Sequence, residues 1–240
     1  MHSLKRIHLT SLLDVVATAA VVVALGVFLL GHFRVSPRRQ SPGVPVPVDP
    51  VSLDGAQTEG VSTAPVALVG YSDFQCPFCR RFAVETLPRL RRVYVATGRL
   101  VLAFRHLPLS IHEHAVEQSR AAACAGEQNM FWPMHDLLFT RPVESFPSGL
   151  EAAAGSLGLS PGRFQACVTD DNGRSAQAIT NDVASAKNLG ITGTPTFLVG
   201  DVIGPNRVHV SSVIAGARPW ADFERSIERA LSERAPVRGN

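Results

Sequence analysis

Two cysteines separated by a proline and a phenylalanine constrain this chain more than any other feature. Cys76 and Cys79 follow the apolar run 66–69, which is typical of a buried strand, and precede a segment with helical spacing of apolar residues. Cys76 is therefore expected at a helix N-terminus, where unpaired backbone N–H groups and the helix dipole stabilise a thiolate. Pro77 suits the first helical position, because the N–H that it lacks would have no partner there. The spacing predicts a pair that opens and closes a disulfide.

Two other interpretations of this pair stay open from the residues alone. The pair could be half of a structural zinc site, but such a site usually needs a second close pair, and Cys124 and Cys167 are far apart in the sequence. It could also be a permanently closed structural disulfide. The flanking strand and helix favour the reversible disulfide over both.

The residues after the pair predict strands at both ends and a helical block between them. A helix continues over 80–95 with a kink at Pro88, and the nearly continuous apolar run 99–105 is typical of a central strand. Further helices are expected over 115–125, 131–139, 150–157, from an N-cap at Ser160, and over 174–189. The final strands, 196–199 and about 208–214, are separated by a turn at Gly200 and Asp201, and a last helix covers 220–231.

A second motif lies late in the chain. Gly193, Thr194 and Pro195 form a tight loop before a β-branched strand, and an X-Pro bond at the start of a strand favours the cis form. The strand, the Cys-Pro-Phe-Cys helix start and the late Thr-Pro together resemble the thioredoxin fold. The helical block makes the chain similar to the DsbA-like thiol–disulfide oxidoreductases in particular, over about residues 66–231.

This resemblance implies an α/β structure, a thioredoxin fold with an inserted all-helical domain over about 112–190. It implies an enzyme, a protein disulfide oxidoreductase, in which Cys76 is the exposed nucleophile and Cys79 the buried resolving thiol. Thr194 and Pro195 would lie beside Cys76, tune the pair and contact an extended substrate chain. The redox-active disulfide needs no further cofactor, and we expect no metal, because the histidines have no cysteine or carboxylate partner at ligand spacing.

The chain departs from the family pattern at the position six residues before the first cysteine. Thioredoxin-like proteins usually carry a buried acid there, which helps to move the proton of the resolving thiol, whereas this chain has Gly70. Asp73 is the nearest carboxylate, and its loop position predicts a helix-cap or turn role. Water is a substitute acceptor for the proton of Cys79. Phe78 cannot stabilise a thiolate as a histidine would, so we expect a moderately oxidising pair.

The other two cysteines lie in the predicted helical insertion. We predict a structural disulfide between Cys124 and Cys167, with two buried free thiols as the alternative. Closing the loop of about 44 residues between these cysteines would stabilise the fold by about 4 kcal/mol in the chain-entropy model. Some DsbA-like proteins carry a second disulfide in the helical domain, so the resemblance permits this pairing without requiring it.

The segment before the catalytic domain predicts a membrane anchor and a tether. Residues 9–33 are apolar apart from Asp14 and a few small polar residues, which is about the length that crosses a bilayer, and residues 1–8 form a short tail. A cleaved signal peptide is the alternative, but no Ala-x-Ala site follows the apolar core. Residues 34–65 are rich in proline and predict a linker that buries no core. The catalytic domain would then cover 66–235.

Function and location follow from the redox chemistry. A disulfide carrier with an extra disulfide belongs outside the reducing cytosol, so we expect a single-pass cell-membrane protein with its catalytic domain extracytoplasmic. A net charge of +3 is too small to indicate nucleic-acid binding. We expect a protein that forms disulfides in reduced secreted or envelope proteins, with a DsbB-like or vitamin K epoxide reductase-like membrane partner implied by the resemblance. An envelope disulfide reductase or isomerase, or a thioredoxin-like binding module, are the alternatives.

Overall fold

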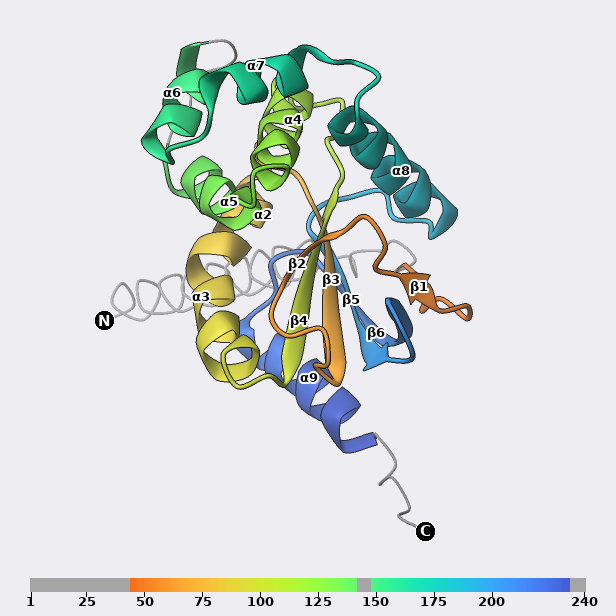
Figure 1. Ribbon diagram of the computed structural model, residues 1–240. Helices are drawn as coiled ribbons and strands as arrows, with labels where there is room; N and C mark the ends of the chain where they lie inside the picture. The colour runs from red at the N-terminus through yellow and green to blue at the C-terminus, as the bar shows by residue number, and fades with distance from the viewer. Residues whose placement is uncertain (1–43, 142–147, 234–240) are drawn as a thin grey trace, which may run out of the picture. The chain divides into compact units, whose positions relative to one another are not determined.

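The structure, a computed structural model, describes residues 44–141 and 148–233, which are built around one sheet (Figure 1). Its six strands lie in the order β1-β6-β5-β3-β4-β2. They are β1 (Val51–Ser52), β2 (Gln57–Glu59), β3 (Val66–Ser72), β4 (Leu100–His106), β5 (Thr196–Val202) and β6 (Arg207–Ala215). β3 and β4 are parallel, and β5 joins β3 in antiparallel register.

The central strands are buried on both faces because nearly every residue in them is apolar. All seven residues of β3 and all seven of β4 are buried. Alternate residues of β3 point to opposite faces. Val66 and Leu68 pack in one core cluster with the last helix, α9 (Trp220–Glu233), while Val69 and Tyr71 pack in another.

A long helical crossover joins the parallel strands β3 and β4. It consists of α2 (Pro77–Arg81), the π-helical turn η1 (Phe82–Thr86), α3 (Leu87–Leu90) and a second π-helical turn, η2 (Arg91–Val95). The sequence predicted one helix kinked at Pro88. The structure instead has π-helical turns on both sides of the short helix that contains this proline. Proline removes one backbone donor from the helix, which accounts for a wider turn before it.

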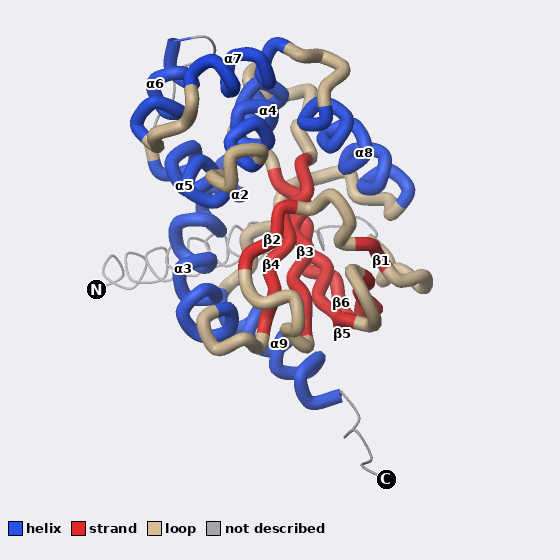
Figure 2. Tube along the Cα trace, in the orientation of Figure 1, coloured by secondary structure: helices blue, strands red, loops and turns tan. Residues whose placement is uncertain are grey.

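The inserted helices lie together at one end of the sheet (Figure 2). They are α4 (Ala115–Gly126), α5 (Phe131–Thr140), α6 (Ser148–Ser156), α7 (Pro161–Thr169) and α8 (Arg174–Asn188). Alanines along α4 are buried against α5, α6 and α7, which form a separate apolar cluster. Ser160 stands at the N-cap of α7 as predicted, although its side chain makes no capping hydrogen bond. The predicted thioredoxin fold with a helical insertion is confirmed.

One buried guanidinium ties the sheet to the elements on either side of it. Arg105 on β4, 7% exposed, donates from Nη1 to Asp182 Oδ1 on α8 at 2.7 Å. Its Nη2 donates to the carbonyl oxygens of Ser52 and Asp54 at 2.8 and 2.9 Å. Asp182 Oδ2 in turn accepts the backbone N–H of His106 at 2.8 Å. A buried ion pair in which the carboxylate and both terminal guanidinium nitrogens are hydrogen-bonded fixes which elements lie next to one another.

The prediction that residues 34–65 form a linker is wrong for the part of this segment that begins at Val51. β1 pairs with β6, and β2 pairs with β4, so both edges of the sheet come from this segment. Val51, Leu53 and Ala64 are buried, and Thr58 O accepts a hydrogen bond from Trp132 Nε1 at 2.9 Å. Short edge strands are held by backbone hydrogen bonds and a few side chains, so a proline-rich composition does not exclude them.

The turn predicted at Gly200 and Asp201 is also placed differently. β5 continues to Val202, and the register shifts between Val199 and Gly200, which marks a bulge. A Cβ added at Gly200 would lie 2.0 Å from the carbonyl oxygen of His209 on β6. The glycine is therefore needed for close approach of two strands rather than for a turn.

Within residues 44–141 and 148–233, no helix combines the length and the apolar character that a membrane crossing requires. The predicted tail, 1–8, and the predicted transmembrane segment, 9–33, lie outside the residues that the structure describes.

Candidate active site

The cysteine pair lies where β3 ends and α2 begins. Cys76 is the N-cap of α2, with extended backbone angles of φ −70° and ψ 122°, and Pro77 follows it in the first turn. The carbonyl of Cys76 accepts the N–H of Arg80 at 3.0 Å. Both cysteines are free thiols, so the structure shows the reduced pair.

Cys76 is more enclosed than the sequence predicted. The residue is 4% exposed and Cys79 is 1% exposed. The loop that precedes β5 accounts for this, because the Cys76 thiol donates to the carbonyl oxygen of Thr194 at 3.4 Å. Thr194 is 118 positions away in the sequence, so no local pattern around Cys76 reveals this cover.

Hydrogen bonds favour the ionised form of Cys76. The hydrogen bond from Cys79, the Thr194 side chain and the backbone N–H groups of Cys79 and Phe78 lower the pKa of Cys76 to about 5, against the opposing effect of burial. Thr194 has two groups of opposite effect. Its carbonyl accepts from the neutral thiol, whereas its hydroxyl supports the thiolate.

The pKa of Cys79 is shifted in the opposite direction. Burial, followed by its hydrogen bond to Cys76, raises the pKa of Cys79, and only hydrogen bonds from Ser72 and the backbone of Asp73 lower it. The pair therefore holds one proton firmly, on Cys79, at neutral pH. A readily ionised nucleophile and a protonated resolving thiol are the protonation states that disulfide exchange needs.

The late motif reaches the cysteines from β5. The Thr194–Pro195 peptide bond is cis. The loop is held by two hydrogen bonds, from Thr196 Oγ1 to the Gly193 carbonyl at 2.7 Å and from the Gly216 N–H to the Pro195 carbonyl at 2.7 Å. The structure thus brings together the four residues for which the sequence predicted catalytic roles: Cys76, Cys79, Thr194 and Pro195.

Asp73 does more than the predicted turn or cap. It is fully buried, and its Oδ1 accepts the N–H of Gln75 at 2.8 Å. Its Oδ2 accepts the N–H of Leu109 at 2.8 Å and lies 2.8 Å from Nδ1 of His112. This carboxylate joins the cysteine loop to the segment that leads into α4. The sequence contains both residues, but nothing in their spacing indicates that they meet.

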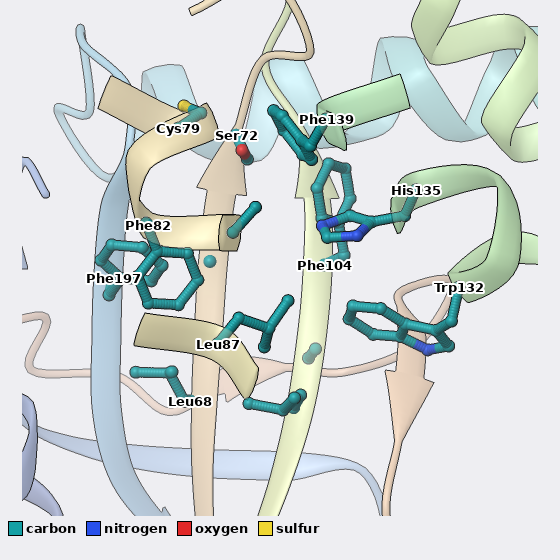
Figure 3. Close-up of a pocket in the computed structure, with 14 residues that line it drawn as sticks. Leu68, Ser72, Cys79, Phe82, Leu87, Phe104, Trp132, His135, Phe139 and Phe197 are labelled. Carbon is teal, nitrogen blue, oxygen red and sulfur yellow. The ribbon is translucent and has the colours of Figure 1, made fainter. Parts of the chain in front are cut away.

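A cavity lies beneath Cys79, at the position where the family pattern would place a buried acid (Figure 3). Its volume is about 30 Å³, and its walls include Gly70, Ser72 and Cys79 on one side and His135 on the other. A Cβ on Gly70 would lie 3.1 Å from the ring of Phe197, so the ring occupies the space that a longer side chain would need.

The second cysteine pair lies in the helical insertion. Cys124 on α4 and Cys167 on α7 form a disulfide with an S–S distance of 2.02 Å and a Cα–Cα distance of 5.8 Å. Cys124 is fully buried in the apolar cluster of the insertion. No group of three or more His, Cys, Asp or Glu side chains in the described ranges is placed to hold a metal ion.

An exposed patch lies beside the cysteines on the first two turns of the crossover helix. Phe78 is 52% exposed, and the guanidinium of Arg81 lies 5.2 Å from its ring centroid. The patch also includes Pro77, Arg80, Val84 and Glu85. It presents an aromatic ring and positive charge next to the Cys76 sulfur.

Comparison with known proteins agrees with this geometry. Residues 54–226 match a protein family described as thioredoxin. The fold is similar to Wolbachia pipientis α-DsbA1, at 22% identity, with a TM-score of 0.62 over 74% of this chain and 92% of that one. It is also similar to Bacillus subtilis BdbD, at 20% identity, with a TM-score of 0.63 over 77% and 99%. Pseudomonas aeruginosa DsbA2 is 26% identical, with a TM-score of 0.58 over 74% and 95%.

Curated relatives of this chain include proteins named as antiporters. A protein named Na(+)/H(+) antiporter NhaA 1 from Salinispora arenicola is 38% identical over 72% of this chain, and NhaA 3 from Salinispora tropica is 39% identical over 57%. The chain spans only 27% and 20% of these two proteins. A continuous match over 72% of 240 residues must include Cys76 and Cys79. The match over residues 54–226 places this chain in the thioredoxin family, with a fold similar to those of the DsbA proteins of Wolbachia pipientis and Pseudomonas aeruginosa.

Proposed function

We propose that this protein forms disulfides in secreted or envelope proteins by exchange through Cys76 and Cys79. The observation that supports the oxidising direction is the lowered pKa of Cys76, at about 5. A stabilised thiolate lowers the free energy of the reduced carrier relative to its disulfide. The disulfide is then a stronger oxidant of other thiols.

The exchange has two steps. A substrate thiolate attacks Sγ of Cys76, the bond between Cys76 and Cys79 breaks, and Cys79 leaves with the electron pair and takes up a proton. A second substrate thiolate then attacks the substrate sulfur of the mixed disulfide, and Cys76 leaves as a thiolate. The substrate gains a disulfide and the carrier gains two electrons. A leaving thiol with a low pKa accelerates the second step.

The loop at Thr194 and Pro195 is the proposed substrate contact. Its backbone lies beside the reactive sulfur, where an extended polypeptide can pair with it in strand fashion. The exposed ring of Phe78 offers apolar area on the other side of that sulfur. A reduced, unfolded polypeptide exposes both backbone and apolar side chains, whereas a folded protein exposes fewer of each.

The reduction potential of the cysteine pair tests this direction. We expect a value between about −180 and about −120 mV, the range of proteins that form disulfides, from equilibration in glutathione buffers. A value near about −270 mV would favour the alternative, an envelope reductase or isomerase. A companion assay follows oxidative refolding of a reduced protein. If the pair exchanged with neither substrate disulfides nor substrate thiols, the remaining alternative would be a thioredoxin-like binding module without exchange activity.

Membrane attachment is the proposed setting. Residues 9–33 would anchor the chain, the rest of the segment before Val51 would be the tether, and the catalytic domain would be extracytoplasmic. The names of the matched antiporters support a membrane setting for domains of this kind. A DsbB-like or vitamin K epoxide reductase-like protein would reoxidise the pair. A topology reporter fused after residue 240 checks the placement, and cytoplasmic signal would contradict it.

A further inference from the structure

The cavity beneath Cys79 lies where thioredoxin-like proteins usually have the side chain of a buried acid. Gly70 contributes no side chain to it, and a Cβ at that position would lie 3.1 Å from the Phe197 ring. A volume of about 30 Å³ holds one or two water molecules, provided that polar groups bind them. Most of the wall is apolar, so the few polar groups determine where water can be held.

Besides the indole of Trp132, whose Nε1 donates to Thr58 O, three polar side chains line this cavity, and Figure 3 shows how they lie. Cys79 and Ser72 are at one end, His135 is at the other, and Ser72 lies between the cysteine and the histidine. A hydrogen bond from Ser72 acts on the Cys79 sulfur. The serine hydroxyl can donate to that sulfur and also contact a water molecule, because a hydroxyl both donates and accepts.

His135 is held in position from the side away from the cysteines. Its Nδ1 lies 2.8 Å from Oδ1 of Asp136, and Oδ2 of that carboxylate accepts from Arg91 at 2.7 Å. Arg91 also pairs with Glu59 at 2.9 Å. A carboxylate held by an arginine favours the Nδ1–H tautomer of the histidine, which leaves a lone pair on Nε2. Nε2 makes no hydrogen bond within the described residues.

His135 is held in the neutral form, which can accept a proton. The residue is 3% exposed, and burial lowers the pKa of His135, with Asp136 opposing that effect. Another buried histidine, His106, packs against the ring of Phe104, which also lines the cavity. Desolvation keeps the imidazole neutral, while the adjacent carboxylate stabilises the imidazolium that would form for a short time.

We infer that His135 accepts the proton of Cys79 through Ser72 and a water molecule in this cavity. The inference depends on the proposed function, because it concerns the step in which Cys79 attacks the mixed disulfide at Cys76. That step occurs both when a substrate disulfide is reduced and when a partner reoxidises the pair. It therefore does not depend on the net direction.

The electron pair of Cys79 forms a bond to Sγ of Cys76, and the bond between Cys76 and the other polypeptide breaks. The released polypeptide sulfur leaves with the electron pair as a thiolate. The proton of Cys79 passes to the cavity water, with Ser72 bonded to both, and a proton of that water passes to Nε2 of His135. In the reverse step the same groups return a proton to Cys79 as it leaves.

Stopped-flow reaction of the reduced protein with 5,5′-dithiobis(2-nitrobenzoate) separates the two thiols. Attack by Cys76 releases the first thionitrobenzoate, and attack by Cys79 on the mixed disulfide releases the second. We expect His135→Phe to leave the first release unchanged and slow the second by about a hundredfold, the lower range for a lost acid–base group. Ser72→Ala should slow the second release by about tenfold.

The pH profile distinguishes proton transfer from a structural effect. The deficit of His135→Phe should shrink as pH rises, because hydroxide can then take the proton, whereas a packing defect would persist. His106→Phe is the matched control, since neither of its ring nitrogens has a hydrogen-bond partner in the described structure and it does not line the cavity. Its second release should match the wild type.

Two further results decide the matter. His135→Gln keeps a polar side chain but cannot take the proton, so it should show the same slow second release if His135→Phe does not fold. An unchanged second release in either folded His135 variant, or an equal loss in His106→Phe, would overturn the inference alone. Absence of the first release in the wild type would remove the proposed function, and this inference with it.

Discussion

The two cysteine pairs of this chain contain the same atoms in different surroundings. Cys76 and Cys79 are three positions apart at a junction of strand and helix, and both are free thiols. Cys124 and Cys167 are 43 positions apart on packed helices and form a disulfide. One pair is placed to exchange partners, and the other is placed to stay closed.

The contrast shows that the groups around a sulfur decide its role. Cys76 faces backbone N–H groups and the Thr194 hydroxyl, which favour a thiolate. Cys124 is fully buried among apolar residues of the insertion, where no attacking thiolate can approach. Cys167 is partly exposed and lies 3.2 Å from the Ser175 hydroxyl, but its partner sulfur is shielded.

The largest expected effect is on exchange. Cys76→Ser should reduce oxidation of a reduced polypeptide to the uncatalysed rate, because a serine hydroxyl does not ionise near neutral pH and cannot form the mixed disulfide. The rate of oxidative refolding of a reduced substrate measures this. Near pH 5, where the ionised thiol adds little stability, the unfolding free energy of the variant should match that of the reduced wild type. Retained exchange would show that Cys76 is not the nucleophile.

Removing the other pair should have the opposite result. Cys124→Ala combined with Cys167→Ala should lower the unfolding free energy by about 4 kcal/mol and leave the exchange rate nearly unchanged below the unfolding transition. Urea unfolding at equilibrium without reductant measures the loss. A variant of normal stability with lost exchange would break the contrast between a structural and a reactive pair.

The third prediction is that both the alkylation rate of Cys76 and the stability of the reduced protein depend on pH. The rate of Cys76 alkylation by iodoacetamide should reach half its maximum near pH 5, the pKa of the folded thiol. Because this pKa lies below the unfolded value, the ionised thiol stabilises the reduced fold, and that contribution is complete above the unfolded pKa of about 9. It should decrease as pH falls from about 9 to about 5. Unfolding of the reduced protein across this range measures it, and Cys76→Ser should remove the slope.

The smallest expected effect sharpens the role of one neighbour. Thr194→Val removes the hydroxyl that supports the thiolate and should raise the pKa of Cys76 by about one unit, the value of one hydrogen bond to a charged group. Iodoacetamide alkylation against pH measures the shift. The Cys124–Cys167 disulfide should stay intact in the variant, as mass mapping without reductant checks. If the pKa of Cys76 did not shift in this variant, the groups at the start of the helix would account for its low value without Thr194.

Local patterns were sufficient where neighbours in sequence are also neighbours in space. The strand before Cys76, the helix start at Pro77 and the loop at Pro195 could all be predicted from spacing, and the family resemblance supplied their arrangement. The cover over Cys76 could not, because it comes from Thr194 on a distant loop. The contact between Asp73 and His112 was missed for the same reason.

The sheet edges show another limit of local patterns. Val51–Ser52 and Gln57–Glu59 lie in a proline-rich segment whose composition predicts an extended tether. Their strand character comes from open edges on β6 and β4, which supply the backbone partners. A segment of weak intrinsic preference takes the structure that its neighbours offer.

The guanidinium of Arg105 has a practical consequence for anyone who shortens this protein. It binds the carbonyl oxygens of Ser52 and Asp54 as well as the carboxylate of Asp182. A recombinant fragment that starts at the first long strand would discard two of these three acceptors and uncover an arginine that the intact chain keeps 7% exposed. Crystallisation fragments should therefore begin ahead of Val51, and trimming α8 would leave the same cation without its counter-ion.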